Sequence, residues 1–126
     1  MSAETFTVGK AEIRKDAWAK VTGAAQYVDD VALPGLAVGM VVRSPHHHAR
    51  IVQIDAGAAR ALPGVIAVIT AADVPGSKTF GPLVQDRPAL AVDVVRHMGE
   101  PVAIVVAEGT TAARRGVEAV AVEYEP

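Results

Sequence analysis

The sequence predicts a single α+β domain, and three observations support this fold class. Its 126 residues match the usual size of one domain. Strand-like apolar runs and two short helical stretches follow one another without the regular rhythm of a doubly wound sheet. Proline and glycine separate these runs, as is typical of turns. With 51% hydrophobic residues, a chain of this size can bury a core without disulfides.

The N-terminal part predicts an irregular arm followed by two strands. Residues 1 to about 20 mix acidic and basic side chains closely, which favours an arm without regular structure. Residues 36–44 form an apolar run that ends at Pro45, because proline cannot donate to a strand ladder. Residues 49–55 predict a second strand, with neither face cleanly apolar.

The middle of the chain predicts a helix, a strand and a helical turn. Asp55 is expected to cap a short helix over residues 56–62, which a Pro-Gly pair ends. Residues 65–70 form a continuous β-branched run, which predicts a strand covered on both faces. Thr70 then begins a single helical turn.

The C-terminal part predicts a long loop, a buried strand, a helix and a last strand. Proline and glycine interrupt residues 75–88, which predicts the longest loop of the chain, without ladder hydrogen bonds. Residues 102–107 predict a second fully buried strand. Thr111 is expected to cap a helix with one apolar face, formed by Ala113, Val117 and Val120. Side chains of residues 119–126 alternate between two faces, which predicts a last strand with Glu123 and Glu125 on the solvent side.

Composition excludes several classes of function. A net charge of −2 argues against a nucleic-acid-binding module that neutralises phosphates. Apolar runs are far shorter than the roughly 20 residues that span a bilayer, and no signal-peptide pattern begins the chain. We therefore expect no membrane contact and a cytoplasmic location. The absence of cysteine excludes thiolate catalysis and cysteine-bound iron–sulfur clusters within these residues.

Two clusters of polar residues are candidates for chemistry. His46 and His48 point to one face of an extended segment and could bind a transition metal, but the sequence marks no third ligand. A solvated turn after Pro45 is the favoured interpretation. The pair Asp29-Asp30 is likewise interpreted as a solvated turn rather than an acid–base pair. The residues alone therefore predict no catalytic, cofactor-binding or metal-binding side chain.

Ordered sequence blocks along nearly the whole chain carry a resemblance to a known family. They include Lys20-Val-Thr-Gly23, Ala25-Gln-Tyr-Val-Asp-Asp30, Val42-Arg-Ser-Pro-His46, Ala61-Leu-Pro-Gly-Val65, Gly99-Glu-Pro-Val-Ala103 and Val122-Glu-Tyr-Glu-Pro126. In this order and spacing the chain resembles the N-terminal α/β-hammerhead domain of the molybdenum hydroxylases, the xanthine dehydrogenase and aldehyde oxidase family. The resemblance implies one hammerhead domain over residues 1–126, without the molybdopterin-binding domains.

The family resemblance also implies cofactors and partners that lie outside these residues. The complete enzyme would hydroxylate an aromatic heterocycle or an aldehyde, with water as the oxygen source. Molybdenum would be held by molybdopterin in the remainder of the large subunit. Two [2Fe–2S] clusters and FAD would lie on other domains or subunits. These 126 residues alone are therefore expected to be inactive and to hold no cofactor.

Within this chain, the resemblance assigns a substrate-channel role to Leu83 and Val84. They match apolar positions that line the substrate funnel in related enzymes, and the alternative is that they pin the loop to the domain. A second interpretation of the whole chain is a freestanding, non-catalytic assembly module with the same fold. The reading frame beyond Pro126 would separate these two interpretations, and zinc titration would test the histidine cluster.

Overall fold

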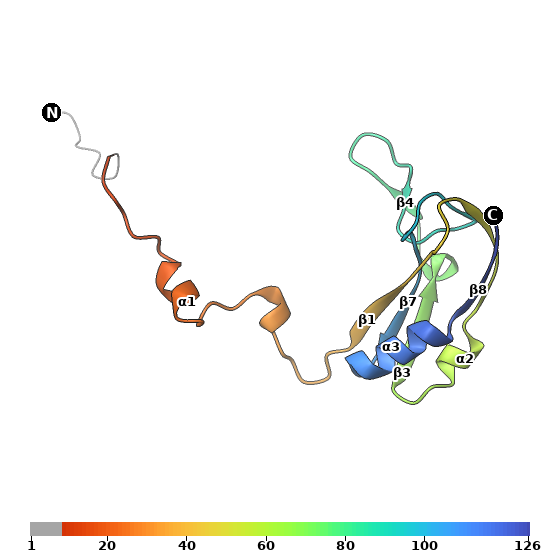
Figure 1. The fold of residues 1–126 in the computed structure, drawn as a ribbon, viewed down its shortest axis with the longest axis horizontal. Coiled ribbons are helices and arrows are strands. Elements are labelled where there is room, and N and C mark those ends of the chain that lie inside the picture. Colours follow the sequence, from red (N-terminus) through yellow and green to blue (C-terminus); the bar gives the residue numbers. More distant parts are fainter. Residues whose placement is uncertain (1–8) are drawn as a thin grey trace. The chain divides into compact units, whose positions relative to one another are not determined.

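The computed structural model describes residues 9–126, which divide into two compact units (Figure 1). The first unit ends at Pro34 and the second begins at Gly35. Among the described residues, no helix is long and apolar enough to cross a membrane.

The first unit holds two short helical segments and no strand among its described residues. They are the α-helix α1 (Ala17–Val21) and the 3-10 helix η1 (Val28–Asp30). Residues 1–8 of the predicted arm lie outside the described residues, and residues 9–16 form neither helix nor strand. Helix α1 begins inside the segment that was predicted to be irregular. Asp16 precedes it and pairs with Lys20 one turn later, which favours a helical turn there.

The second unit is an α+β domain, as predicted. In chain order its elements are β1 (Val38–Arg43), β2 (Ala49–Asp55), α2 (Gly57–Arg60), β3 (Val65–Thr70), η2 (Ala71–Asp73), β4 (Thr79–Phe80), β5 (Arg87–Pro88), β6 (Val94–Val95), β7 (Pro101–Ala107), α3 (Thr110–Ala119) and β8 (Ala121–Glu125). The strands pair antiparallel throughout, in the orders β1-β7-β3, β6-β2-β8 and β4-β5. Strand β7 is thus central in its sheet.

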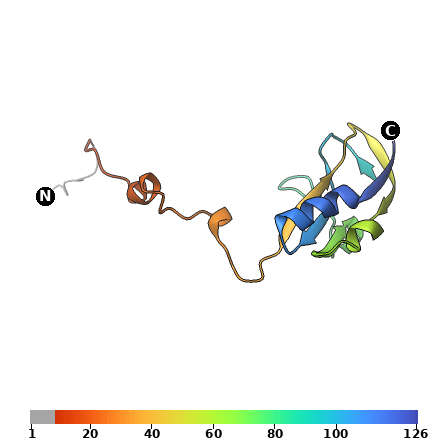
Figure 2. The same cartoon turned by 60° about the horizontal axis from the view of Figure 1, so that its bottom comes forward.

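Helices α2 and α3 cover one face of the β1-β7-β3 sheet (Figures 1 and 2). The core beneath them is built from small apolar side chains: Val42, Ala56, Ala59, Val68, Ala103 and Val105. A second cluster lies on the β6-β2-β8 sheet, formed by Ala49, Ala91, Val95 and Val102. Val122 on β8 packs against both clusters, so the last strand joins the two parts of the core.

Gly116 explains how helix α3 packs so closely on the sheet. A Cβ atom at this position would lie 2.6 Å from Cγ1 of Val105 and 3.2 Å from Cγ2 of Val65. Glycine in a helix costs roughly 1 kcal/mol of helix propensity relative to alanine. Here that cost is offset, because the missing side chain lets the helix backbone approach strands β7 and β3.

Four details of the second unit differ from the sequence prediction. Helix α2 spans Gly57–Arg60 and not residues 56–62, and its N-cap is Ala56 and not Asp55, although Oδ1 of Asp55 accepts a hydrogen bond from the N–H of Gly57 at 2.8 Å. Strand β3 is buried or half-buried at every residue except Ile66, which is exposed, and it lies at the edge of its sheet rather than at its centre. Helix α3 begins at Thr110 with Gly109 as its N-cap, so Thr111 does not cap it. The long loop does contain ladder pairing, between β4 and β5, because proline is tolerated in a short strand of this kind.

Candidate functional site

The loop that carries the predicted channel residues stands on a short two-stranded ladder. Thr79 pairs with Pro88 and Phe80 pairs with Arg87. Just below this ladder, the N–H of Ala89 donates to the carbonyl oxygen of Lys78 at 3.0 Å. The pairing fixes where the loop leaves the domain and where it returns.

Leu83 and Val84 lie together at the exposed part of this loop, and neither is pinned to the domain. Leu83 is 96% exposed and Val84 is 67% exposed. Gly81 shapes this part of the loop, because a Cβ atom there would lie 1.9 Å from the carbonyl oxygen of Val84. Only glycine permits this close approach of the two backbone segments.

A hollow of about 470 Å³ lies at the base of the loop. It is bordered by Phe80, Asp86, Arg87, Pro88, Ala89, Arg96, His97, Glu100 and Pro101. Charged groups of both signs line it, so the hollow has no strong preference for anions or cations. The exposed side chains of Leu83 and Val84 are therefore on the same loop as a hollow with charged groups of both signs.

Glu100 is a buried carboxylate at the edge of this hollow, only 5% exposed. Its Oε2 atom accepts a hydrogen bond from the backbone N–H of Arg96. Its Oε1 atom lies 3.8 Å from Nη1 of Arg96. The segment between these two residues is thereby closed into a fixed turn. Sequence reasoning gave Glu100 no role, although it stands in the block Gly99-Glu-Pro-Val-Ala103 that carries the resemblance.

The block that ends at His46 packs directly against the block that contains Glu100. The N–H of Ser44 donates to the carbonyl oxygen of Glu100 at 3.0 Å, and the N–H of Gly99 donates to the carbonyl oxygen of Ser44 at 2.8 Å. Nη1 of Arg43 also donates to the carbonyl oxygen of Gly99, at 2.8 Å. Two sequence blocks that are far apart along the chain therefore form one supporting structure beneath the hollow.

Ser44, His46 and Tyr124 form a polar cluster on the same support. Oγ of Ser44 accepts a hydrogen bond from the N–H of His46 at 3.0 Å. The rings of His46 and Tyr124 lie 4.9 Å apart between centroids. Burial raises the pKa of the Tyr124 hydroxyl, although a hydrogen bond with the Ser44 side chain acts in the opposite direction. The phenol therefore stays protonated at neutral pH and serves as packing with a polar end.

Two polar clusters were noted in the sequence, the histidines at 46–48 and the Asp29-Asp30 pair, and among the described residues neither gains a further metal-ligating side chain. His46 is half-buried beside Tyr124, whereas His47 and His48 are exposed. Within residues 9–126, no group of three or more histidine, cysteine, aspartate or glutamate side chains could hold a metal ion. The Asp29-Asp30 pair lies on exposed η1, where Oδ2 of Asp30 accepts a hydrogen bond from the N–H of Tyr27 at 2.9 Å.

In residues 9–126 every buried side-chain nitrogen or oxygen atom already has a hydrogen-bond partner. We assign no cofactor contact to these residues and derive no step through molybdopterin from them.

Comparison with known proteins identifies the family of this domain. The profile of the aldehyde oxidase and xanthine dehydrogenase a/b hammerhead domain matches residues 22–126. The chain is 40% identical over 115 residues to a probable xanthine dehydrogenase subunit of Bacillus subtilis, covering 91% of this chain and 15% of that protein. It is 35% identical over 125 residues to the nicotinate dehydrogenase large molybdopterin subunit of Eubacterium barkeri, covering 99% of this chain and 29% of that protein.

A solved structure with the same fold is the reconstituted CO dehydrogenase from Oligotropha carboxidovorans. It superposes with a TM-score of 0.88 at 42% sequence identity, covering 94% of this chain and 15% of the matched chain. The present chain therefore spans less than a third of the length of each of these relatives.

Proposed function

The chain belongs to the aldehyde oxidase and xanthine dehydrogenase family as its a/b hammerhead domain, and from this we propose that it is the structural and substrate-channel domain of a molybdenum hydroxylase large subunit. In this proposal the complete enzyme hydroxylates an aromatic heterocycle or an aldehyde, with water as the oxygen source. It acts in the cytoplasm. The similarity to a nicotinate dehydrogenase large molybdopterin subunit supports a heterocyclic substrate.

Other parts of the enzyme supply the cofactors. Molybdopterin and molybdenum are bound by the remainder of the large subunit, and the [2Fe–2S] clusters and FAD lie on partner domains or subunits. When bound, the molybdenum centre supplies the oxygen-transfer chemistry. The residues of the hammerhead domain contribute the shape and polarity of the entrance and hold them in place.

The exposed position of Leu83 and Val84 is the observation that carries the channel role. Had these side chains served only to pin the loop, they would be buried against their own domain. Instead both side chains are exposed on a loop whose two ends are paired as strands β4 and β5. Gly81 lets its own backbone lie close to the carbonyl oxygen of Val84. Apolar side chains in this position exclude water and contact the flat faces of an aromatic ring.

Val84→Trp in the complete enzyme tests this function. The larger side chain narrows the entrance, so KM for bulky heterocycles rises while the molybdenum content stays unchanged. Val52→Trp is the matched control, because Val52 is also exposed but lies on strand β2. An unchanged substrate profile in Val84→Trp, at wild-type molybdenum content, would contradict the channel role.

A further inference from the structure

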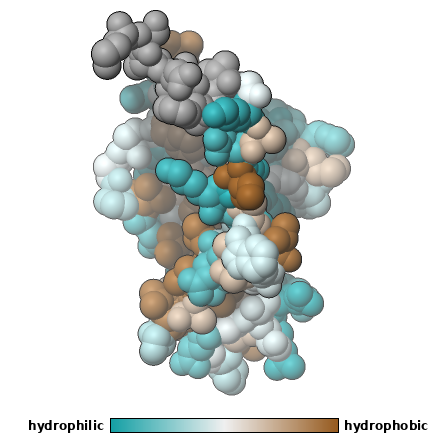
Figure 3. Space-filling view, turned by 90° about the vertical axis from the view of Figure 1, so that its left-hand side faces the viewer, coloured by the Kyte–Doolittle hydropathy of each residue, from teal (hydrophilic) through white to brown (hydrophobic). Residues whose placement is uncertain are grey.

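In the structure the arm extends further than the sequence predicts: it is defined here as residues 9–34, and it contains no buried side chain. Only Ala17, Ala19 and Ala25 are partly covered. Seven large apolar residues of the arm are exposed: Ile13, Trp18, Val21, Tyr27, Val28, Val31 and Leu33. Figure 3 shows apolar residues at the surface, interleaved with hydrophilic ones. A segment that stays in water does not need so many apolar side chains, so their presence indicates a surface that covers them.

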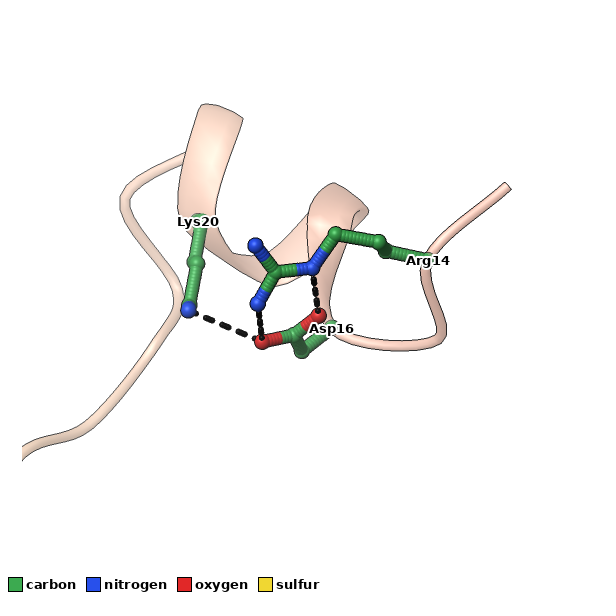
Figure 4. Close-up of polar contacts among 3 residues, drawn as sticks. All are labelled: Arg14, Asp16 and Lys20. Carbon is green, nitrogen blue, oxygen red and sulfur yellow. Dashed lines mark hydrogen bonds and ion pairs between the residues drawn. The ribbon is translucent and has the colours of Figure 1, made fainter. Parts of the chain in front are cut away.

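Local contacts hold the shape of the arm around helix α1. Asp16 accepts hydrogen bonds from Nε and Nη2 of Arg14 at 3.0 and 2.8 Å, and its Oδ2 atom lies 2.8 Å from Nζ of Lys20 (Figure 4). Lys20 and Arg14 lower the pKa of the Asp16 carboxyl, which keeps it charged at neutral pH. Exposed ion pairs add little stability, and helices shorter than about 12 residues are marginal in water. These contacts stabilise the turn around helix α1, but they do not bury the apolar side chains of the arm.

Helix α1 separates its charged and apolar groups. Asp16 and Lys20 are four residues apart and share one side. Trp18 and Val21 are three residues apart and share another side, and both are highly exposed, Trp18 at 77%. The ion pairs therefore hold a helical turn that presents Trp18 outward. A rigid aromatic side chain presented in this way is the typical anchor of a protein interface.

The charge of the arm favours a protein surface as its partner. Four basic residues, Lys10, Arg14, Lys15 and Lys20, balance four acidic ones, Glu12, Asp16, Asp29 and Asp30. A segment without net charge has no electrostatic attraction to phosphates or to anionic lipid. Its apolar side chains match an apolar groove instead.

The matched CO dehydrogenase chain is much longer than the present one, and its match extends into the arm. The match covers 94% of the 126 residues, or about 118, and residues 35–126 account for only 92 of them. At least 26 residues before position 35 are therefore included in the match. The arm thus has a counterpart in a chain of which the present one spans only 15%. Most of that longer chain is available to cover it.

We propose that the arm is a docking segment for the remainder of the large subunit, with Trp18 as its anchor. This inference rests on the proposed function, because it requires that the domain be part of a large subunit. In the complete subunit the arm packs against the remainder of the large subunit, and its apolar residues are buried only there.

Limited trypsin digestion of the complete large subunit and of the 126-residue chain tests the proposal. Lys15 and Lys20 flank Trp18 and are the cleavage sites to follow by mass spectrometry. Cleavage there should be at least about tenfold slower in the complete subunit. Trp18→Ala in the complete subunit should remove most of this protection. Gln26→Ala, an exposed polar position of the same arm, should leave the protection unchanged.

Two outcomes would overturn the proposal. Equal cleavage rates in the complete subunit and in the 126-residue chain would mean that the remainder of the large subunit does not cover the arm. Protection of the 126-residue chain that grows with its own concentration would mean that a second copy covers it. The substrate profile of Val84→Trp does not depend on this cleavage. An unprotected arm together with an altered profile would therefore reject the docking role and leave the proposed function standing.

Discussion

Ser44 and Glu100 are joined through their backbones, with the N–H of Ser44 donating to the carbonyl oxygen of Glu100 at 3.0 Å. Both residues are buried, and their side chains have separate partners. The contact ties the end of strand β1 to the turn that precedes β7. The hollow at the base of the loop that carries Leu83 and Val84 is therefore supported by two segments that are distant in sequence.

Ser44→Ala should destabilise the domain by about 1–3 kcal/mol, because it leaves the N–H of His46 without its acceptor at a partly buried site. The free energy of unfolding in urea measures this loss. Ser77→Ala is the control, since the Ser77 hydroxyl donates to the carbonyl oxygen of Thr79 at an exposed site. Equal stability of the two variants would show that the Ser44 hydroxyl has no supporting role.

Gly116→Ala should also destabilise the domain, by about 1–3 kcal/mol, although alanine favours helices. The new Cβ atom would overlap with Val105 and force helix α3 away from the sheet. Gly39→Ala provides the comparison, because its Cβ atom would lie 3.7 Å from the nearest side-chain atom, that of Ile104. Thermal unfolding of both variants measures the difference. A more stable Gly116→Ala domain would contradict the close packing of α3.

Asp73→Ala should reduce stability at neutral pH, and the difference from wild type should close in acid. The N–H and the hydroxyl of Thr70 donate to Oδ2 of Asp73 at 2.7 and 2.9 Å. The N–H of Thr70 is the main cause that lowers the pKa of the Asp73 carboxyl below its ordinary value of 3.8. Stabilisation by this carboxylate is therefore present above pH 3.8 and is lost as the pH falls through the lowered folded-state pKa.

Urea unfolding of wild type and Asp73→Ala at a series of pH values checks this dependence. Asp86→Ala removes a carboxylate from the exposed loop and controls for the change in net charge. A difference in stability that stays constant down to the acid limit would show that the carboxylate charge of Asp73 is not what stabilises the turn.

Strands with strong β-branched runs and clear proline or glycine boundaries were predicted from the sequence. The bounds of β2 and β3 agree with the predicted residues 49–55 and 65–70. Burial was harder to predict, because a β-branched run does not tell whether its strand is central or at an edge. Strand β3 lies at the edge of its sheet, and its residue Ile66 is exposed. Strands β4, β5 and β6 have two residues each, which is too short for any periodic pattern.

The site was predictable only in part. Leu83 and Val84 came from the family resemblance; the structure shows that both are exposed, and their channel role stays a proposal. The pairing of Ser44 with Glu100 depends on tertiary structure, and no local pattern marks it. The sequence signal for a role of Glu100 was its place in a family block. There it stands between glycine and proline, outside any predicted helix or strand.

Alkylation of Val84→Cys in the complete enzyme tests the central claim most directly. Because the 126 residues contain no native cysteine, the modified peptide is unambiguous by mass spectrometry. We predict that a saturating heterocyclic competitive inhibitor slows modification by N-ethylmaleimide at position 84 and leaves Val52→Cys unaffected. An unchanged rate at position 84 with the inhibitor bound would contradict the assignment of this loop to the substrate channel.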